Sequence, residues 1–141
     1  MSAGRVFIDT NILVYAYNEA DALKRAEAVN LLRTNAGRLV LSTQVIQEFY
    51  AAGLRKLKLP RPKMRSAVNQ LLKLPIVTLS GEHIQAAFEF EDAYGISFWD
   101  GLIIAAAASA KAEILYTEDL NHGQRYGAVT ACNPFVQSAM N

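Results

Sequence analysis

The chain has 141 residues, of which 52% are hydrophobic and 19% are charged, and its formal net charge is +1. This composition excludes a disordered or low-complexity protein, and the length predicts a single domain over residues 1–141. A single cysteine, Cys132, excludes an intrachain disulfide, and with only two histidines it gives no support for a Cys/His metal site. The N-terminus lacks a signal-peptide core and no apolar stretch could span a bilayer, so we expect a cytoplasmic protein without membrane contact.

Short apolar runs alternate with helical patterns along the chain. The runs predicted as strands are 6–8, 39–41, 76–79, 114–116 and a weaker one at 128–130. The predicted helices begin after Asp9 and then cover about 21–35, 43–57, 62–72, 81–94 and 98–111. The last of these is rich in Leu, Ile and Ala, which predicts burial on most sides. The alternation indicates an α/β domain with a mainly parallel sheet flanked by helices.

Two acidic residues follow predicted strands, and two lie on predicted helices. Asp9 directly follows the first strand, and Asp119 comes shortly after the fourth, so both belong beyond the carboxyl ends of parallel strands. Glu48 borders the apolar face of its helix, as a side chain lining a cleft would. Asp100 falls in the first turn of the last helix, where the helix dipole favours the ionised form. Taken singly, each also has an ordinary explanation as a helix cap, a turn former or a solvated side chain.

Taken together, these carboxylates predict a metal site. Several like charges in one cleft repel one another, so a folded protein tolerates them mainly when a cation is bound. Oxygen ligands without cysteine or paired histidine indicate Mg²⁺ or Mn²⁺. Such a site suits hydrolysis of a phosphodiester, because the metal activates a water and stabilises charge on the leaving oxygen. The residues alone therefore predict a metal-binding acidic cleft.

Five short motifs along the chain occur together in a known family. They are Phe7-Ile8-Asp9-Thr10-Asn11, Gln47-Glu48-Phe49, Ser97-Phe98-Trp99-Asp100, Thr117-Glu118-Asp119-Leu120-Asn121-His122-Gly123 and Asn133-Pro134-Phe135. With these motifs the chain resembles the PIN-domain ribonucleases and, within them, the VapC-type toxins of prokaryotic toxin–antitoxin pairs. One departure is Gly101, which stands where an alanine is more usual and is expected to loosen its helix turn.

The resemblance implies a five-stranded parallel sheet and a Mg²⁺-dependent endoribonuclease acting on RNA, with tRNA or rRNA as the expected substrate. The family's acidic quartet maps onto Asp9, Glu48, Asp100 and Asp119, and the supporting side chains onto Thr10, Asn11 and Thr117. The three aspartates would coordinate the metal, while Glu48 would orient the attacking water or bind a second ion. Asn11 is expected to hold the turn. The resemblance also implies a homodimer, and a small antitoxin whose C-terminal segment covers the active site.

A basic segment, residues 55–73, is the expected RNA-binding surface. It holds half of the 14 Lys and Arg residues and no Asp or Glu. Several cations near a cleft anchor RNA phosphates without reading sequence. The residues expected to do so are Arg55, Lys56, Lys58 and Arg61. A solvated helical hairpin explains the same charges equally well.

Aromatic residues near the acidic motifs offer a second kind of RNA contact. Tyr50, Tyr94 and Trp99 could stack on unpaired bases. For Trp99 we expect core packing, because its neighbours are apolar.

Two other interpretations stay open at this point. A phosphorylation-receiver domain is also a small α/β protein that binds Mg²⁺ through carboxylates, but it needs adjacent acids after the first strand and a lysine after the last. Asp9 stands alone and no lysine follows Lys111. A catalytically silent PIN-fold module would bind RNA or protein without cleaving, and the presence of all four acids argues against it.

Overall fold

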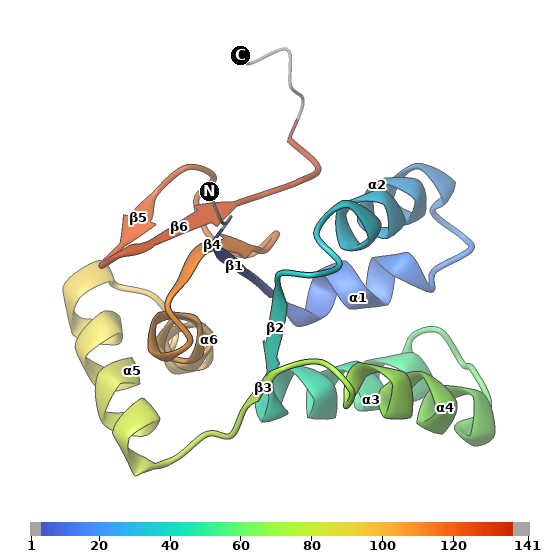
Figure 1. Cartoon of the computed structure of the whole chain (residues 1–141), viewed down its shortest axis with the longest axis horizontal. Helices are drawn as coiled ribbons and strands as arrows, with labels where there is room; N and C mark the ends of the chain where they lie inside the picture. The colour runs from blue at the N-terminus through green and yellow to red at the C-terminus, as the bar shows by residue number, and fades with distance from the viewer. Residues whose placement is uncertain (1–3, 137–141) are drawn as a thin grey trace.

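The computed structural model of the chain describes residues 4–136 and contains a six-stranded sheet in the order β3-β2-β1-β4-β6-β5 (Figure 1). The strands are β1 (Arg5–Ile8), β2 (Leu39–Ser42), β3 (Ile76–Val77), β4 (Ala112–Tyr116), β5 (Arg125–Tyr126) and β6 (Val129–Cys132). Every pairing is parallel except that of β5 with β6. The mainly parallel sheet predicted from the sequence is confirmed, and β5 is a short antiparallel addition to the five expected strands.

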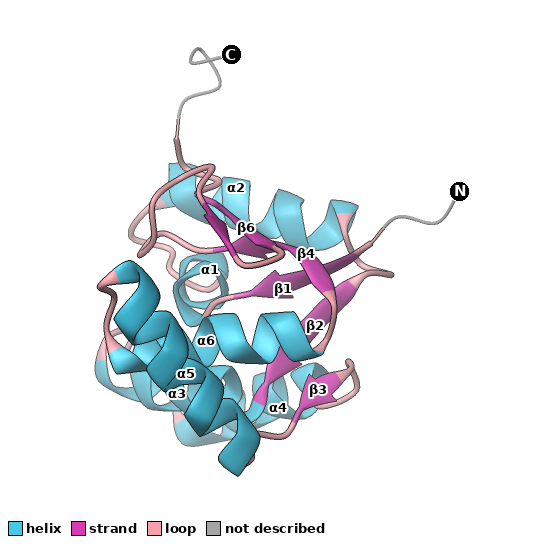
Figure 2. Cartoon of the chain, turned by 90° about the vertical axis from the view of Figure 1, so that its left-hand side faces the viewer, coloured by secondary structure: helices cyan, strands magenta, loops and turns pink. Residues whose placement is uncertain are grey.

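The helices flank this sheet and cover the segments expected from the sequence. They are α1 (Thr10–Ala16), α2 (Ala22–Thr34), α3 (Thr43–Arg55), α4 (Arg61–Leu71), α5 (Gly81–Tyr94) and α6 (Phe98–Ser109). α6 packs against the sheet with α5 outside it, and α1 and α2 lie on the opposite face (Figure 2). α3 and α4 pair as a helical hairpin beyond the end of β2 (Figure 1). Among residues 4–136, no helix is both long and apolar enough to cross a membrane.

The central strands are buried because helices cover both faces of the sheet. Val6, Phe7 and Ile8 of β1 are at most 1% exposed, and β2 is buried throughout. Burial on two faces explains why these strands are unbroken apolar runs and not alternating patterns. α6 is buried at every position from Gly101 to Ala107, which confirms the prediction that this helix is buried on most sides.

The strand order determines where a site can form. The chain adds β2 and β3 on one side of β1 and then returns to place β4 on the other side. Connections that leave two neighbouring strands in opposite directions open a crevice beyond their carboxyl ends. The backbone N–H of Asp9, directly after β1, donates to the carbonyl of Tyr116 at the end of β4 at 3.0 Å. The crevice therefore opens beside Asp9 and beside the loop that follows β4.

Gly101 has a packing role that the sequence did not reveal. A Cβ atom at this position would lie 2.8 Å from the carbonyl oxygen of Ala87 and 3.3 Å from its Cα. Ala87 belongs to α5, and both residues are buried. The absent side chain thus allows α5 and α6 to approach closely. The sequence predicts only that Gly101 loosens its helix turn, and the structure adds a close helix–helix contact at this residue.

Replacement of Gly101 by alanine should therefore destabilise the protein. Overpacking against a backbone carbonyl costs about 1–3 kcal/mol, which outweighs the gain of about 1 kcal/mol that alanine brings to a helix. Urea denaturation of Gly101→Ala measures the net loss. The matched control is Gly81→Ala at the start of α5, where a Cβ meets nothing within 4 Å. Equal or greater stability of Gly101→Ala than of wild type would contradict the close contact.

Candidate active site

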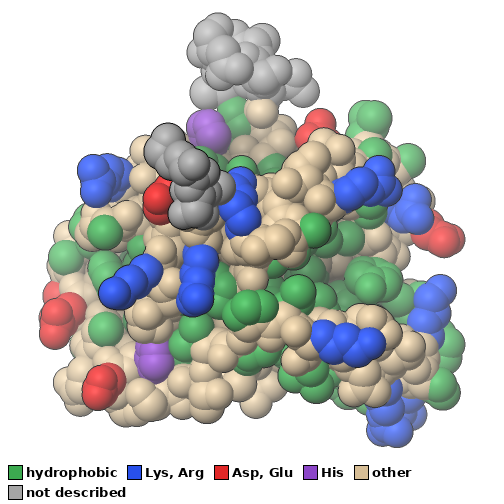
Figure 3. Space-filling model, in the orientation of Figure 1, with side chains coloured by type: hydrophobic (Ala, Val, Ile, Leu, Met, Phe, Trp, Pro, Cys, Tyr) green, Lys and Arg blue, Asp and Glu red, His purple; other side chains and the backbone are tan. Residues whose placement is uncertain are grey.

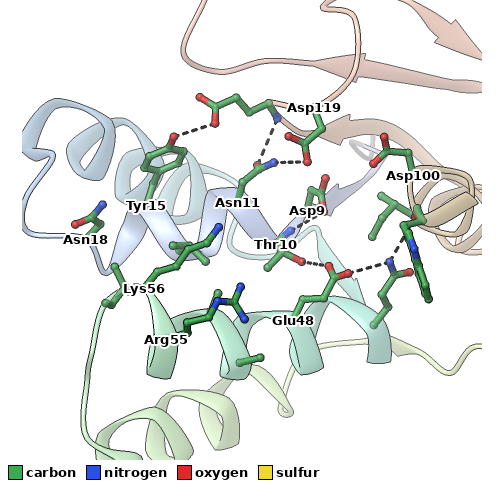
Figure 4. A pocket seen from close by; sticks show the side chains of 18 of the residues that line it. Asp9, Thr10, Asn11, Tyr15, Asn18, Glu48, Arg55, Lys56, Asp100 and Asp119 are labelled. Carbon is green, nitrogen blue, oxygen red and sulfur yellow. Dashed lines mark hydrogen bonds between the residues drawn. The ribbon is translucent and has the colours of Figure 1, made fainter. Parts of the chain in front are cut away.

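A cleft of about 860 Å³ opens beyond the carboxyl ends of β1 and β4 (Figure 4). It is lined by all four acids singled out in the sequence: Asp9, Glu48, Asp100 and Asp119. They come from four separate parts of the chain, namely the end of β1, α3, the first turn of α6 and the loop after β4. The fold therefore brings together residues that are up to 110 positions apart, from Asp9 to Asp119.

Asp9 is the most buried of the four, with 5% of its surface exposed. Its Oδ1 accepts a hydrogen bond from the backbone N–H of Thr10, and its Oδ2 accepts one from the Thr117 hydroxyl, both at 2.7 Å. Burial raises the pKa of Asp9 from 3.8 to about 7, although these two hydrogen bonds lower it. The neighbouring charges of Asp119 and Glu48 raise the pKa further. The pKa of Asp9 thus lies near neutral pH.

Glu48 is held from two directions on the opposite wall of the cleft. Its Oε1 accepts a hydrogen bond from the Thr10 hydroxyl at 2.7 Å, and its Oε2 accepts one from the Gln44 side-chain amide at 3.2 Å. Thr10 therefore contacts Asp9 through its backbone and Glu48 through its side chain. The other amide atom of Gln44, Oε1, is buried without a partner in the described part of the chain, which leaves an unused acceptor at the cleft wall.

The loop that carries Asp119 is fixed by Asn11 and Thr117. The Asn11 amide donates to Asp119 Oδ2 at 3.0 Å, and Asn11 Oδ1 accepts from the backbone N–H of Glu118 at 3.3 Å. The Thr117 hydroxyl accepts from the Asp119 backbone N–H at 3.0 Å while it donates to Asp9. Asn11 therefore ties the start of α1 to the loop after β4, and Thr117 links two of the acids.

Asp100 lies on the remaining side of the cleft, at the start of α6. Its backbone N–H donates to the Ser97 hydroxyl, the cap of the helix, at 3.1 Å. Partial burial raises the pKa of Asp100, a hydrogen bond with Ser97 lowers it, and the charges of Asp119 and Glu48 raise it. The charges of Asp119 and Glu48 thus act on both Asp9 and Asp100.

The four carboxylates line the same cleft but do not converge on a single point. Within residues 4–136, no three acidic, histidine or cysteine side chains form a ready-made metal cluster. Hydroxyl and amide groups instead hold Asp9, Glu48 and Asp119 apart.

Comparison with known proteins places this cleft in a family. The family model for the PIN domain matches residues 6–127. The chain belongs to the PIN domain family. The match includes all four acids of the cleft and the strands and helices that position them. None of the curated proteins matches the sequence.

Solved structures share the fold of this PIN domain at low sequence identity. A toxin–antitoxin complex from Klebsiella pneumoniae matches with a TM-score of 0.71 and 19% identity, over 92% of this chain and 98% of that chain. The Mycobacterium tuberculosis toxin VapC20, described as cleaving the sarcin–ricin loop, matches with a TM-score of 0.67 and 17% identity, over 81% and 89%. VapBC2 from Rickettsia felis, bound to promoter DNA, matches with a TM-score of 0.65 and 22% identity, over 89% and 96%.

The PIN domain also contains a supporting contact that the sequence did not suggest. Lys24 of α2 forms an ion pair with Glu118, the residue before Asp119, and this hydrogen bond raises the pKa of Lys24. The Lys24 ammonium also lies 4.5 Å from the ring centre of Tyr15 and 5.0 Å from that of Phe135. Tyr15 donates a hydrogen bond from its hydroxyl to Glu118 at 2.9 Å. α1, α2 and the segment after β6 together hold the loop that carries Asp119.

The four cations predicted to bind RNA fall into two pairs, one that lines the cleft and one that does not. Arg55 and Lys56 line the cleft, at the end away from Asp100 (Figure 4). Lys58 and Arg61 are exposed but do not line it. Arg55 and Lys56 could therefore contact a molecule bound in the cleft. Lys58 and Arg61 could contact only a molecule that extends beyond the cleft.

The expectation that Trp99 packs in the core is wrong. Trp99 is 62% exposed and lines the cleft beside Asp100, because α6 turns its buried face toward the sheet only from Gly101 onward. Tyr50 and Tyr94 do not line the cleft. The Tyr50 hydroxyl accepts from Arg65 at 3.2 Å, and the Tyr94 hydroxyl accepts from the backbone of Gly127 at 2.9 Å.

The raised pKa of Asp9 predicts an unusual dependence of stability on pH. The folded chain keeps the Asp9 proton up to about pH 7, whereas the unfolded chain loses it near its ordinary pKa of 3.8. The stronger binding of this proton by the folded chain stabilises the fold. The contribution is fully present below pH 3.8 and is lost as the pH rises through about 7. In EDTA, the free energy of unfolding attributable to Asp9 should therefore fall by about 1 kcal/mol per pH unit across this range.

Urea denaturation at several pH values in EDTA tests this dependence. Asp9→Asn mimics the protonated carboxyl and should flatten the profile. Asp92→Asn, at an exposed position of α5, serves as the control and should leave it unchanged. An identical slope in wild type and Asp9→Asn would contradict the assignment.

Proposed function

We propose that this PIN domain is a metal-dependent endoribonuclease that hydrolyses phosphodiester bonds of RNA. The observation that carries the proposal is the set of four carboxylates from four elements that line one cleft, with Asp9 almost fully buried. A fold has no stability reason to gather like charges around a buried acid, because the charges of Asp119 and Glu48 raise the pKa values of Asp9 and Asp100. Membership of the PIN domain family and the predicted nuclease motifs support the same activity.

The side chains of the cleft fit a hard divalent cation, Mg²⁺ or Mn²⁺. All of the candidate ligands are oxygens, and the partnerless Gln44 Oε1 adds a neutral acceptor at the wall. Asp9, Asp100 and Asp119 would hold the ion, directly or through water, with Glu48 nearby. When bound, the ion would supply an activated water and neutralise charge on the leaving oxygen.

The remaining groups would position the reactants. Thr10 and Thr117 hold Asp9, and Thr10 also holds Glu48, so that Glu48 can orient a water for attack on the phosphorus. Asn11 keeps Asp119 facing the cleft. Arg55 and Lys56 would bind the phosphates next to the scissile bond, and Lys58 and Arg61 would bind phosphates farther along.

Trp99 is the expected base contact of this site. Its exposed ring lies beside Asp100 and could stack on an unpaired base next to the cleaved bond. An unpaired segment of a tRNA or rRNA in the cytoplasm is the proposed substrate. The description of the M. tuberculosis VapC20 structure as a toxin that cleaves the sarcin–ricin loop supports a structured RNA as target.

We propose that the chain acts as the toxin of a type II toxin–antitoxin pair and that a cognate antitoxin covers the cleft. A toxin–antitoxin complex from K. pneumoniae is similar to this chain in fold, and so is VapBC2 from R. felis. Addition of the antitoxin should stop RNA cleavage.

We also propose a homodimer. α5 exposes Ile84 and Phe88, which are 42% and 44% exposed, and Phe88 packs against Phe98 of α6 with ring centres 5.6 Å apart. A second copy covering this apolar surface would remove it from water. Light scattering should give twice the monomer mass for wild type and the monomer mass for Phe88→Ser.

Incubation of the purified protein with total cellular RNA tests the nuclease. With Mg²⁺ or Mn²⁺ we expect discrete cleavage that is absent in EDTA. Asp100→Asn should reduce the rate by about a hundredfold or more, because a metal site contributes several kcal/mol to the barrier. Asp92→Asn should cleave like wild type. If folded, antitoxin-free protein cleaves nothing, or if Asp100→Asn keeps full activity, the silent RNA- or protein-binding module becomes the better interpretation.

A further inference from the structure

A second groove continues the catalytic cleft away from Asp100. This basic groove, as we call it, has a volume of about 520 Å³ and lies between the loop from α1 to α2 and the α3–α4 hairpin. Its lining shares Asn18, Ala20, Lys56 and Leu57 with the cleft. In the close-up, Asn18 and Lys56 lie at the end of the cleft opposite Asp100 (Figure 4). The two hollows therefore lie side by side and share part of their wall, and we refer to them together as the channel.

The basic groove carries positive charge that the protein itself does not neutralise. Arg25 of α2, Lys56 and Lys63 of α4 line it together with a single acid, Glu19. All three cations are exposed. Within residues 4–136 the one salt bridge is that of Lys24 with Glu118, so no carboxylate comes within 4 Å of these three cations. In the view of Figure 3, Lys and Arg side chains lie on both halves of the face, including the half formed by α2, α3 and α4.

The channel is electrically asymmetric along its length. Five carboxylates line the cleft: the four acids of the candidate site and Glu118, which pairs with Lys24. The cations that line the two hollows lie toward one end, Arg55 and Lys56 in the cleft and Arg25 and Lys63 in the groove. The other end is formed by Trp99 and Ile103 and contributes no cation to the lining. A polyanion that places one phosphate among the carboxylates is repelled there, so its binding depends on the basic end.

We propose that the basic groove binds the phosphates of the RNA strand on one side of the cleaved bond, through Arg25 and Lys63 in continuation of Lys56. This inference rests on the proposed nuclease function and adds two residues from outside the motifs. A positively charged groove that tracks the backbone, together with an aromatic ring for stacking, is the arrangement that binds a single strand. The nucleotides on the Trp99 side would then bind by stacking, and those on the groove side by charge.

An acidic peptide would be attracted by the same charges. RNA is favoured because the groove shares its wall with the proposed phosphodiester site, and a strand whose scissile phosphate lies in that site has its next phosphates beside the groove.

The test compares two charge-matched double variants. Arg25→Gln with Lys63→Gln removes two of the three groove cations and leaves Lys56 in place. Arg33→Gln with Lys111→Gln removes one exposed cation from α2 and one just after α6, outside both hollows and outside the basic segment. Fluorescence polarisation measures binding of single-stranded RNAs of 4 and 12 nucleotides in EDTA over a range of KCl concentrations. EDTA separates binding from cleavage.

We expect the groove variant to bind the 12-nucleotide RNA about tenfold more weakly at 0.1 M KCl, with the slope of log K against log salt reduced by about 1.4 for two phosphates. Its affinity for the 4-nucleotide RNA should be unchanged, because that strand does not fill both hollows. The control variant should match wild type with both RNAs.

Three results would overturn the inference: no binding of the 12-nucleotide RNA by wild type, equal losses in the two double variants, or an equal loss of affinity for a polyglutamate peptide of the same charge. If wild type cleaves no RNA and the groove variant still loses affinity selectively, the nuclease proposal fails and the groove assignment stands. If wild type cleaves and the groove variant binds normally, the groove assignment alone fails.

Discussion

The burial of the Asp9 carboxyl is the constraint on which this structure depends. A carboxylate that is 5% exposed is unfavourable unless it is protonated, hydrogen-bonded or paired with a cation. The fold supplies two hydrogen bonds, from the Thr10 backbone and the Thr117 hydroxyl, and they do not offset burial, since the pKa still rises to about 7. The parallel pairing of β1 with β4 fixes Asp9 in this position.

The rest of the scaffold places further charge around that buried acid. The loop carrying Asp119 is tied to α1 through Asn11 and to α2 through the ion pair of Glu118 with Lys24. Close packing of α5 on α6 at Gly101 sets the start of α6, next to Asp100. The site is therefore a consequence of tertiary contacts on several sides, and each contact is made by a residue outside the acidic quartet.

Much of this arrangement could be predicted from the sequence, because strand ends and helix starts leave local signals. Asp9 was predicted at a crevice since it directly follows an apolar run, and Asn11 was predicted to hold a turn. Trp99 was wrongly expected in the core, because apolar neighbours in sequence do not reveal which way a helix is rotated. The ion pair of Lys24 with Glu118 spans 94 residues, a separation at which spacing carries no information.

Binding of a divalent cation by the buried acid and its neighbours is the central claim about this site. Calorimetric titration of Mn²⁺ into the protein at about pH 6.5, in two buffers that differ in protonation enthalpy, measures binding and proton release together. A cation that replaces the Asp9 proton must expel it, so we predict binding with release of a substantial fraction of one proton. Absence of binding, or binding without proton release, would contradict the central role of Asp9.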